Sequence, residues 1–272
     1  MANKIPRVPV REQDPKVRAT NFEEVCYGYD LEEATLEASR CLQCKNPRCV
    51  AACPVNIRIP DFIGALHRGE LQQAADIIAE DSSLPSICGR VCPQESQCEG
   101  SCILGIKSEP VAIGKLERFV GDWKLEHGAA AHRTAPRNGR RVAVIGSGPA
   151  GLSVAEYLNI RGHAVTVFER ADRVGGLLMY GIPNMKLDKS VIERRIRIMQ
   201  AEGVEFRTSM DVGGAVDAES ILNSYDAVVL CCGAKKARDL NVPGRDANGV
   251  HFAVDSVSYT HLRAHETEAD LV

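Results

Sequence analysis

The sequence contains no apolar run long enough to cross a bilayer, and its first residues lack the apolar segment of a signal peptide. Neither sign of charge is in excess, since 33 lysines and arginines face 36 aspartates and glutamates. These absences exclude the basic surface of a nucleic-acid-binding protein and argue against a membrane or exported one. We therefore expect a cytoplasmic protein of 272 residues, long enough for two domains, with no nucleic-acid or membrane partner.

Cysteine, by contrast, is concentrated in one part of the chain. Nine of the eleven cysteines precede residue 103, and the other two, Cys231 and Cys232, are adjacent. In an exported chain such a concentration would suggest disulfides, but a chain that stays in a reducing compartment keeps its thiols. Metal or cluster ligation is therefore the favoured interpretation. Cys231 and Cys232 end an apolar segment that predicts a buried strand, so we assign them no redox role.

Eight of the cysteines form two groups of four. The first group, over 41–53, has the spacing C-x2-C-x4-C-x3-C followed by proline, and the second, over 88–102, has the spacing C-x3-C-x5-C-x3-C. Close spacing lets one loop wrap several thiolates around a compact cluster, and Cys-Pro is typical of bacterial ferredoxins. Structural zinc is the alternative, because C-x2-C pairs also bind zinc. A second C-x2-C or a histidine pair at zinc-finger spacing is missing, however.

The spacing of apolar residues divides the chain into a helical part and an α/β part. Helical periodicity predicts, in chain order, a helix over 30–40, a helical hairpin over 60–80 and a helix over 110–126. A stretch of small residues, proline and glycine without periodicity predicts a linker over 128–139. The elements expected after the linker are a strand over 142–145, a helix over 150–161, a strand over 164–169, a helix over 189–202, and strands over 204–207 and 227–232.

A glycine-rich turn joins the first expected strand of the α/β part to its helix. Gly146 permits the tight turn, Gly148 lets the backbone approach a pyrophosphate, and Gly151 allows close packing of helix on strand. The helix N-terminus adds amide donors and a positive dipole end. A glycine turn without ligand is the alternative, which the complete strand-helix-strand setting disfavours. The residues expected to line a bound dinucleotide here are Gly146, Ser147, Gly148, Pro149, Ala150 and Gly151.

Glu169 ends the second strand, where a carboxylate accepts hydrogen bonds from the ribose hydroxyls of the adenosine. A 2′-phosphate placed about 4 Å from this carboxylate would meet a repulsion of roughly 4 kcal/mol per charge pair at an effective dielectric constant of about 20. The turn therefore favours FAD or NAD over NADP.

The chain resembles a known family in both parts. The stretches RCLQCKNPRCVAACPVNIRIP, LPSICGRVCPQESQCEGSC and EPVAIGKLERF are similar to the N-terminal iron-sulfur domain shared by glutamate synthase β (small) subunits, ferredoxin-dependent NADP reductases and dihydropyrimidine dehydrogenase. The resemblance spans about residues 20–255. It implies an α-helical domain with two [4Fe-4S] clusters over 1–127, the linker, and an incomplete Rossmann-like α/β domain that binds FAD over 140–257.

The resemblance also implies which side chains hold the clusters. One cluster would be bound by Cys41, Cys44, Cys49 and Cys102, and the other by Cys53, Cys92, Cys98 and Glu117. Without the resemblance, Glu117 would be interpreted as an exposed surface glutamate. Cys26 and Cys88 are left without a role.

In the α/β part, the segments over 172–189 and 225–244 resemble the second flavin-contacting stretch and the closing strand and turn of the family's FAD domain, which favours FAD over NAD. The further FAD contacts that the resemblance implies are Gly175, Gly176, Leu177, Lys186 and Val212. A solvated lysine is the alternative for Lys186.

The resemblance implies that the full-length protein passes electrons from NADPH through FAD and the two clusters to a large partner subunit, where 2-oxoglutarate and glutamine-derived ammonia become glutamate. Two alternatives remain, a ferredoxin-linked NADP oxidoreductase subunit and a zinc-stabilised interaction module. The flavin would perform the chemistry, so no protein side chain is expected to act as a catalytic acid or base.

The C-terminal segment departs from the family pattern. The family's NADPH-binding domain would follow residue 255, whereas this chain ends in SYTHLRAHETEADLV, over 258–272, which resembles a translated adaptor sequence. We expect this tail to be artefactual and the chain as written to be inactive with NADPH, which only the full-length protein would bind.

Overall fold

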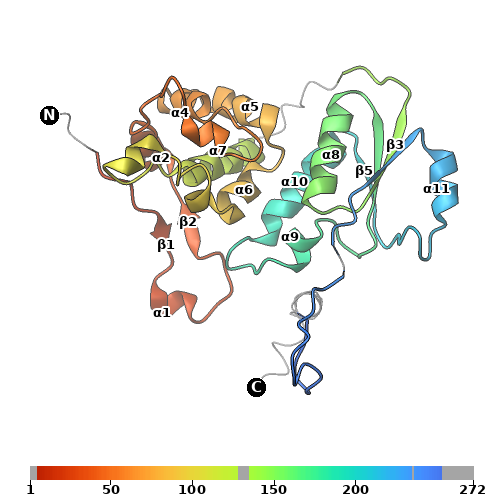
Figure 1. Ribbon diagram of the computed structural model, residues 1–272. Coiled ribbons are helices and arrows are strands. Elements are labelled where there is room, and N and C mark those ends of the chain that lie inside the picture. The colour runs from red at the N-terminus through yellow and green to blue at the C-terminus, as the bar shows by residue number, and fades with distance from the viewer. Residues whose placement is uncertain (1–4, 128–134, 235, 253–272) are drawn as a thin grey trace. The chain divides into compact units, whose positions relative to one another are not determined.

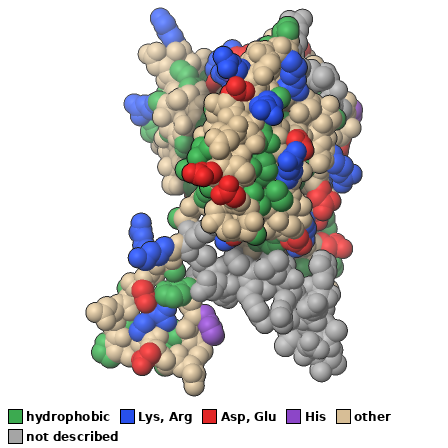
Figure 2. Space-filling model, turned by 90° about the vertical axis from the view of Figure 1, so that its right-hand side faces the viewer, with side chains coloured by type: hydrophobic (Ala, Val, Ile, Leu, Met, Phe, Trp, Pro, Cys, Tyr) green, Lys and Arg blue, Asp and Glu red, His purple; other side chains and the backbone are tan. Residues whose placement is uncertain are grey.

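A computed structural model describes residues 5–127, 135–234 and 236–252 (Figure 1). The expected linker thus lies partly, and the expected tail wholly, outside the described residues. The chain forms two compact units, one of Met1–Ala130 with Asn184–Arg195 and one of Ala131–Pro183 with Ile196–Val272. Acidic and basic side chains are interspersed on the face drawn in Figure 2, in line with the small net charge. None of the described helices is long and apolar enough to cross a membrane.

The first unit is mainly helical. Its elements are β1 (Arg11–Glu12), α1 (Pro15–Arg18), β2 (Cys26–Gly28), α2 (Leu31–Ala38), α3 (Arg48–Ala51), α4 (Ile59–His67), α5 (Leu71–Asp81), α6 (Pro85–Val91), the 3₁₀ turns η1 (Gln94–Ser96) and η2 (Ile103–Ile106), and α7 (Ile113–His127). The predicted helix over 30–40 is present as α2, which begins with a capping box of Asp30 and Glu33. The predicted hairpin is present as α4 and α5.

Two details of the helical unit differ from the sequence-based expectation. Helix α7 begins at Ile113 rather than at Pro110, and the N–H of Ala112 just before it donates 2.8 Å to the buried carboxylate of Glu37. Helix α6 was not expected. It is short and starts at Pro85, so its few apolar positions do not establish a period.

Helices α4, α5 and α7 enclose the core of this unit with the apolar faces that the periodicity predicted. The core residues with least exposure are Ala34, Phe62, Ile63, Ala65, Leu66, Ala74, Ala112, Leu116 and Val120. Each fully buried large side chain contributes about 1.5–3 kcal/mol.

Glycines allow α6 and α7, which lie against each other, to approach unusually closely (Figure 1). A Cβ added to Gly89 on α6 would lie 2.6 Å from the Cα of Arg118 on α7, and one added to Gly121 would lie 2.6 Å from the backbone N of Ser86. The two backbones are therefore in direct contact. This contact places the cysteine-bearing segment over 88–92 beside the middle of α7.

A buried ion pair joins the N-terminal segment to the rest of the helical unit. Arg40 donates 2.6 Å to Glu37, and both side chains are almost fully buried. Glu37 also accepts hydrogen bonds from the N–H groups of Val8 and Ala112, each at 2.8 Å, and Arg40 donates 2.7 Å to the carbonyl of Glu109. The pair thus connects three distant segments beside Cys41.

The second unit is an α/β layer. Its elements are β3 (Arg141–Ile145), α8 (Pro149–Ile160), β4 (Ala164–Phe168), α9 (Leu177–Tyr180), β5 (Glu205–Arg207), α11 (Ala218–Ser224) and β6 (Ala227–Leu230), while α10 (Lys189–Ala201) begins in the first unit and ends in the second. The strands are parallel in the order β5-β4-β3-β6. The chain moves outward from β3 through β4 to β5 and then returns to the other side of β3, as in half of a doubly wound dinucleotide fold.

The prediction of a buried strand over 227–232 is wrong in its burial. Strand β6 ends at Leu230, which is 75% exposed, and Cys232 is exposed as well. The reason is that β6 lies at the edge of the described sheet and pairs only with β3. Cys231 and Cys232 therefore are not simple core residues.

Replacing Glu37 tests the importance of the buried ion pair. We expect Glu37→Ala to lower the free energy of unfolding by about 3–5 kcal/mol, because it leaves the Arg40 charge and two backbone N–H groups buried without their acceptor. Urea unfolding followed by circular dichroism measures the loss. The control is Glu70→Ala, which removes the exposed pair of Glu70 with Arg68 and should leave the midpoint unchanged. Equal midpoints for the two variants would contradict the prediction.

Candidate cluster and dinucleotide sites

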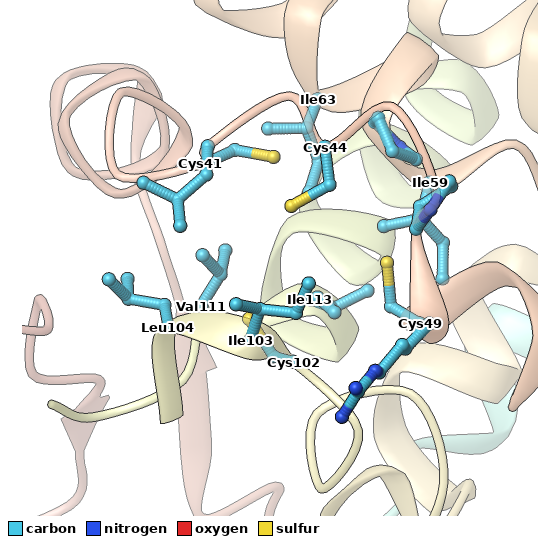
Figure 3. Close-up of a pocket in the computed structure, with 14 residues that line it drawn as sticks. Cys41, Cys44, Cys49, Ile59, Ile63, Cys102, Ile103, Leu104, Val111 and Ile113 are labelled. Carbon is cyan, nitrogen blue, oxygen red and sulfur yellow. The ribbon is translucent and has the colours of Figure 1, made fainter. Parts of the chain in front are cut away.

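Four of the predicted cysteine ligands line one pocket of the helical unit (Figure 3). They are Cys41, Cys44, Cys49 and Cys102, and the pocket has an empty volume of about 390 Å³, part of it open to solvent. Gln43 has a φ of +47°, which bends the backbone between Cys41 and Cys44 so that both sulfurs face the same space. The remaining walls are mostly apolar, with Ile59, Ile63 and Ile113 among them.

The thiols of Cys41 and Cys49 are both influenced by neighbouring thiols of this pocket. Burial raises the pKa of the Cys41 thiol, and the charges of Cys102 and Cys44 raise it further. Burial likewise raises the pKa of Cys49 to about 11, with Cys102 and Cys41 adding to the shift. Four thiolates cannot share an apolar pocket unless a positive group compensates their charge. Iron supplies such a charge, so the donor set fits an iron-sulfur cluster.

The other predicted ligands gather at a second place in the same unit. Burial raises the pKa of Cys98 to about 12, and Glu117 and Cys53 are among the charges that add to it. Burial also raises the pKa of Cys92, and the charges of Glu117 and Cys53 raise it further. Cys92 and Cys98 therefore each lie within electrostatic range of Glu117 and Cys53, although these residues come from separate segments.

Glu117 is buried rather than exposed on the surface. It lies on α7 and is 6% exposed, and its Oε1 has no hydrogen-bond partner among the described residues. Burial raises its pKa to about 8. A buried carboxylate oxygen without a donor is costly. The cost is removed if the oxygen binds a metal, so the residues present fit a second cluster.

Cys88 also belongs to this second place, which the sequence analysis did not recognise. Burial raises the pKa of its thiol to about 12, and the neighbouring charges are those of Glu117, Cys92 and Cys53. The signal was available in the sequence, because Cys88 precedes Cys92 by one helical turn. The ligand count implied by the family resemblance left it out.

In the described part of the chain, no three Cys, His, Asp or Glu side chains approach one another as closely as the ligands of a single metal ion. All eleven cysteines are free thiols. A zinc ion draws its sulfurs to about 2.3 Å from one centre. A four-iron cube instead binds each ligand at a separate iron, so its ligands stand further apart.

The glycine turn of the second unit has the geometry that its sequence predicts. Gly146 has a φ of +102°, and a Cβ there would lie 2.4 Å from the carbonyl oxygen of Cys231. A Cβ on Gly151 would lie 1.9 Å from the carbonyl oxygen of Gly146. Gly148 differs, since a Cβ there would meet nothing within 4 Å. Its open side lies at the N-terminus of α8, at the carboxyl end of the sheet, where a pyrophosphate fits.

Ser147 joins the glycine turn to the two other segments of the predicted flavin site. Its N–H donates 3.0 Å to Oε2 of Glu169, and its hydroxyl donates to the same oxygen. The hydroxyl in turn accepts a 3.0 Å hydrogen bond from the N–H of Gly175. Sequence reasoning did not foresee this connection. Both donors of Ser147 are thus occupied within the protein, and Glu169 is held against the turn.

The remaining predicted flavin residues are not all gathered at the turn. Gly176 lies beside it, because a Cβ on Gly176 would be 2.9 Å from the Cα of Gly148. Leu177 is 62% exposed and Lys186 is exposed, whereas Val212 packs against the core around Phe168. Their contacts with FAD stay predictions, as does the contact of Glu169 with ribose.

Two family models match successive parts of the chain. The model described as dihydropyrimidine dehydrogenase domain II, 4Fe-4S cluster, matches residues 18–129. The model described as pyridine nucleotide-disulphide oxidoreductase matches residues 140–272. The chain is therefore of the class in which a [4Fe-4S] domain precedes a pyridine nucleotide oxidoreductase domain.

Curated relatives show which proteins of this class the chain resembles. The chain is 41% identical to the glutamate synthase [NADPH] small chain of Bacillus subtilis over 92% of its own length and 52% of that protein. It is 40% identical to the small chain of Mycobacterium tuberculosis over 94% of its length and 52% of that protein, and 43% identical to the glutamate synthase [NADH] of Schizosaccharomyces pombe over 89% of its length and 12% of that protein. The chain is therefore similar to glutamate synthase small chains and spans about half the length of the small chains it matches.

A pair of glycine substitutions tests the dinucleotide turn. We expect Gly148→Ala to fold normally, because its φ of −64° suits alanine and the added methyl meets open space. The methyl should nevertheless weaken FAD binding at least tenfold, because it occupies the space of the pyrophosphate. Titration with FAD followed by flavin fluorescence measures the affinity.

Gly151→Ala is the matched control for folding. Its methyl would overlap a backbone carbonyl, so we expect a loss of about 1–3 kcal/mol in the free energy of unfolding. Undiminished FAD affinity of Gly148→Ala would contradict the assignment of the open side of the turn to the cofactor.

Proposed function

We propose that this chain is the electron-transferring part of an NADPH-dependent flavin and iron-sulfur oxidoreductase of the glutamate synthase small-chain type, with two [4Fe-4S] clusters and FAD. The observation that supports it best is the crossed grouping of the ligands. Cys102 joins Cys41, Cys44 and Cys49 from the other cysteine run, while Cys53 leaves its own run to join the second group. Such an exchange is the pattern of proteins that hold two clusters side by side.

The bound groups supply the redox chemistry, since FAD accepts two electrons as a hydride and the clusters transfer electrons singly. The residues of the chain position and insulate these groups. Ile59, Ile63 and Ile113 form an apolar wall of the first pocket. Burial there disfavours thiolates without a compensating charge, and iron would supply that positive charge. The backbone around Gly148 offers space and amide dipoles for the pyrophosphate of FAD.

The glycine turn suits FAD better than NADP. The Glu169 carboxylate is fixed against the turn by Ser147, so its negative charge cannot move away from a 2′-phosphate. NADPH would therefore bind elsewhere in the full-length protein. The assignment of residues 140–257 to a partial FAD domain and of residues 1–127 to a two-cluster domain is part of this proposal.

The partner of the full-length protein is proposed to be a large subunit that makes glutamate from 2-oxoglutarate. The support comes from the relatives, because the same stretch of sequence occurs in separate small chains and as 12% of the glutamate synthase of Schizosaccharomyces pombe. A cytoplasmic location agrees with eleven free thiols. No described feature favours the ferredoxin-linked alternative over this partner.

Iron analysis of cysteine variants tests the crossed grouping. Anaerobically reconstituted protein should contain about eight irons and eight sulfides per chain. We expect Cys102→Ser and Cys98→Ser each to lose up to half of the iron, and the electron paramagnetic resonance signal lost should differ between them. Cys26→Ser is the matched control and should keep all the iron, since Cys26 lies on β2 outside both groups.

Two results would overturn the proposal. One is a colourless protein that binds zinc and no iron, which would support the zinc-stabilised module. The other is loss of the same signal in both variants, which would place Cys98 and Cys102 at a single cluster.

A further inference from the structure

The second cluster site contains more candidate ligands than one [4Fe-4S] cluster uses. Its four predicted ligands are Cys53, Cys92, Cys98 and Glu117, and the thiol of Cys88 lies among them. The contact of α6 with α7 accounts for this position. Gly89 lies directly against the backbone of Arg118, and Cys88 and Glu117 each precede a residue of that contact by one position. The helix contact therefore places Cys88 and Glu117 on adjoining parts of α6 and α7, and the Glu117 charge acts on the Cys88 thiol.

The surroundings of Cys88 fix its backbone in this position. Its carbonyl accepts a 3.0 Å hydrogen bond from the side-chain amide of Gln94, and that amide fills the space beside Gly114 on α7. Glu117 is the largest contributing charge at its thiol, followed by Cys92 and Cys53, and the Ser82 hydroxyl hydrogen-bonds to the sulfur. Cys88 thus contacts the same group of side chains as the predicted ligands.

Glu117 independently indicates that a ligand binds here. Its side chain belongs to a residue that is only 6% exposed, and its Oε1 lacks any hydrogen-bond donor in the described part of the chain. A carboxylate is also a weaker electron donor to iron than a thiolate. It is therefore the member of the set most easily replaced by a neighbouring cysteine.

We propose that Cys88 is a reserve ligand of the second cluster, and that its thiolate takes the place of Glu117 at the iron when the carboxylate is withdrawn. This inference rests on the proposed function, because it requires the second cluster. In the exchange the iron–oxygen bond breaks, an iron–sulfur bond forms, and the thiol proton passes to the released carboxylate. No electron is gained or lost. The thiolate-bound cluster should have a lower reduction potential, since the thiolate donates more charge.

The experiment compares four variants with the wild-type chain after anaerobic reconstitution with iron and sulfide. We expect Glu117→Ala to keep the wild-type iron content, because Cys88 replaces the lost ligand, and to show an altered resonance signal and a lower potential for the second cluster only. Cys88→Ser alone should keep both clusters. The double variant Glu117→Ala/Cys88→Ser should lose up to half of the iron and the second signal, while Glu117→Ala/Cys26→Ser, the matched control, should behave as Glu117→Ala.

The outcomes separate this inference from the proposed function. If wild-type protein binds no iron, the proposed function fails and the inference with it. If wild-type protein holds about eight irons but Glu117→Ala loses as much as the double variant, only the inference fails. Loss of the second cluster in Cys88→Ser alone would make Cys88 a permanent ligand and also overturn it. If the double variant keeps the first-cluster signal and the circular dichroism spectrum, it is folded. The altered signal of Glu117→Ala tests the ligand exchange even without the double variant.

Discussion

The direct contact between the backbones of α6 and α7 is the constraint on which the helical unit depends. Gly89 and Gly121 make it possible, since a methyl group at either position would overlap the facing helix. The contact places Glu117, on α7, near thiols that come from α6, from the segment after α6 and from the segment between α3 and α4. A buried carboxylate beside several buried thiols is unfavourable in the protein alone. Iron bound there, as proposed, would neutralise the negative charge and make the arrangement favourable.

In the α/β unit, the main constraint is that backbone N–H groups must be accessible to a phosphate. Gly146 and Gly151 are required by contacts inside the protein, whereas Gly148 leaves space. Ser147 fixes the turn by bonding to Glu169 on one side and to Gly175 on the other. Three segments that are separate in the sequence thereby become one surface at the end of β3, where the strand order reverses. The same hydrogen bonds hold a negative charge where it disfavours a 2′-phosphate.

Several elements could be predicted from local sequence alone. The helix that begins after Asp30, the apolar periodicity of α4 and α5, and the glycine turn between β3 and α8 depend on residues close together in the chain, and each is present where expected. The burial of β6 could not be predicted in this way. An apolar segment such as AVVLCC forms a strand by its own propensity, but its exposure depends on which neighbours cover it.

The sequence by itself determined the two kinds of unit, the cysteine inventory and the turn chemistry, because periodicity, spacing and glycine conformations are local properties. Only the tertiary structure decided which side chains share a site. Spacing along the chain places Cys88 with Cys92 and leaves Glu117 as an ordinary surface residue. Packing of α6 on α7 buries that glutamate near thiols from three segments. The physical reason is that the pKa of a group and its ability to bind metal depend on burial and on neighbouring charges, which arise from contacts between distant segments.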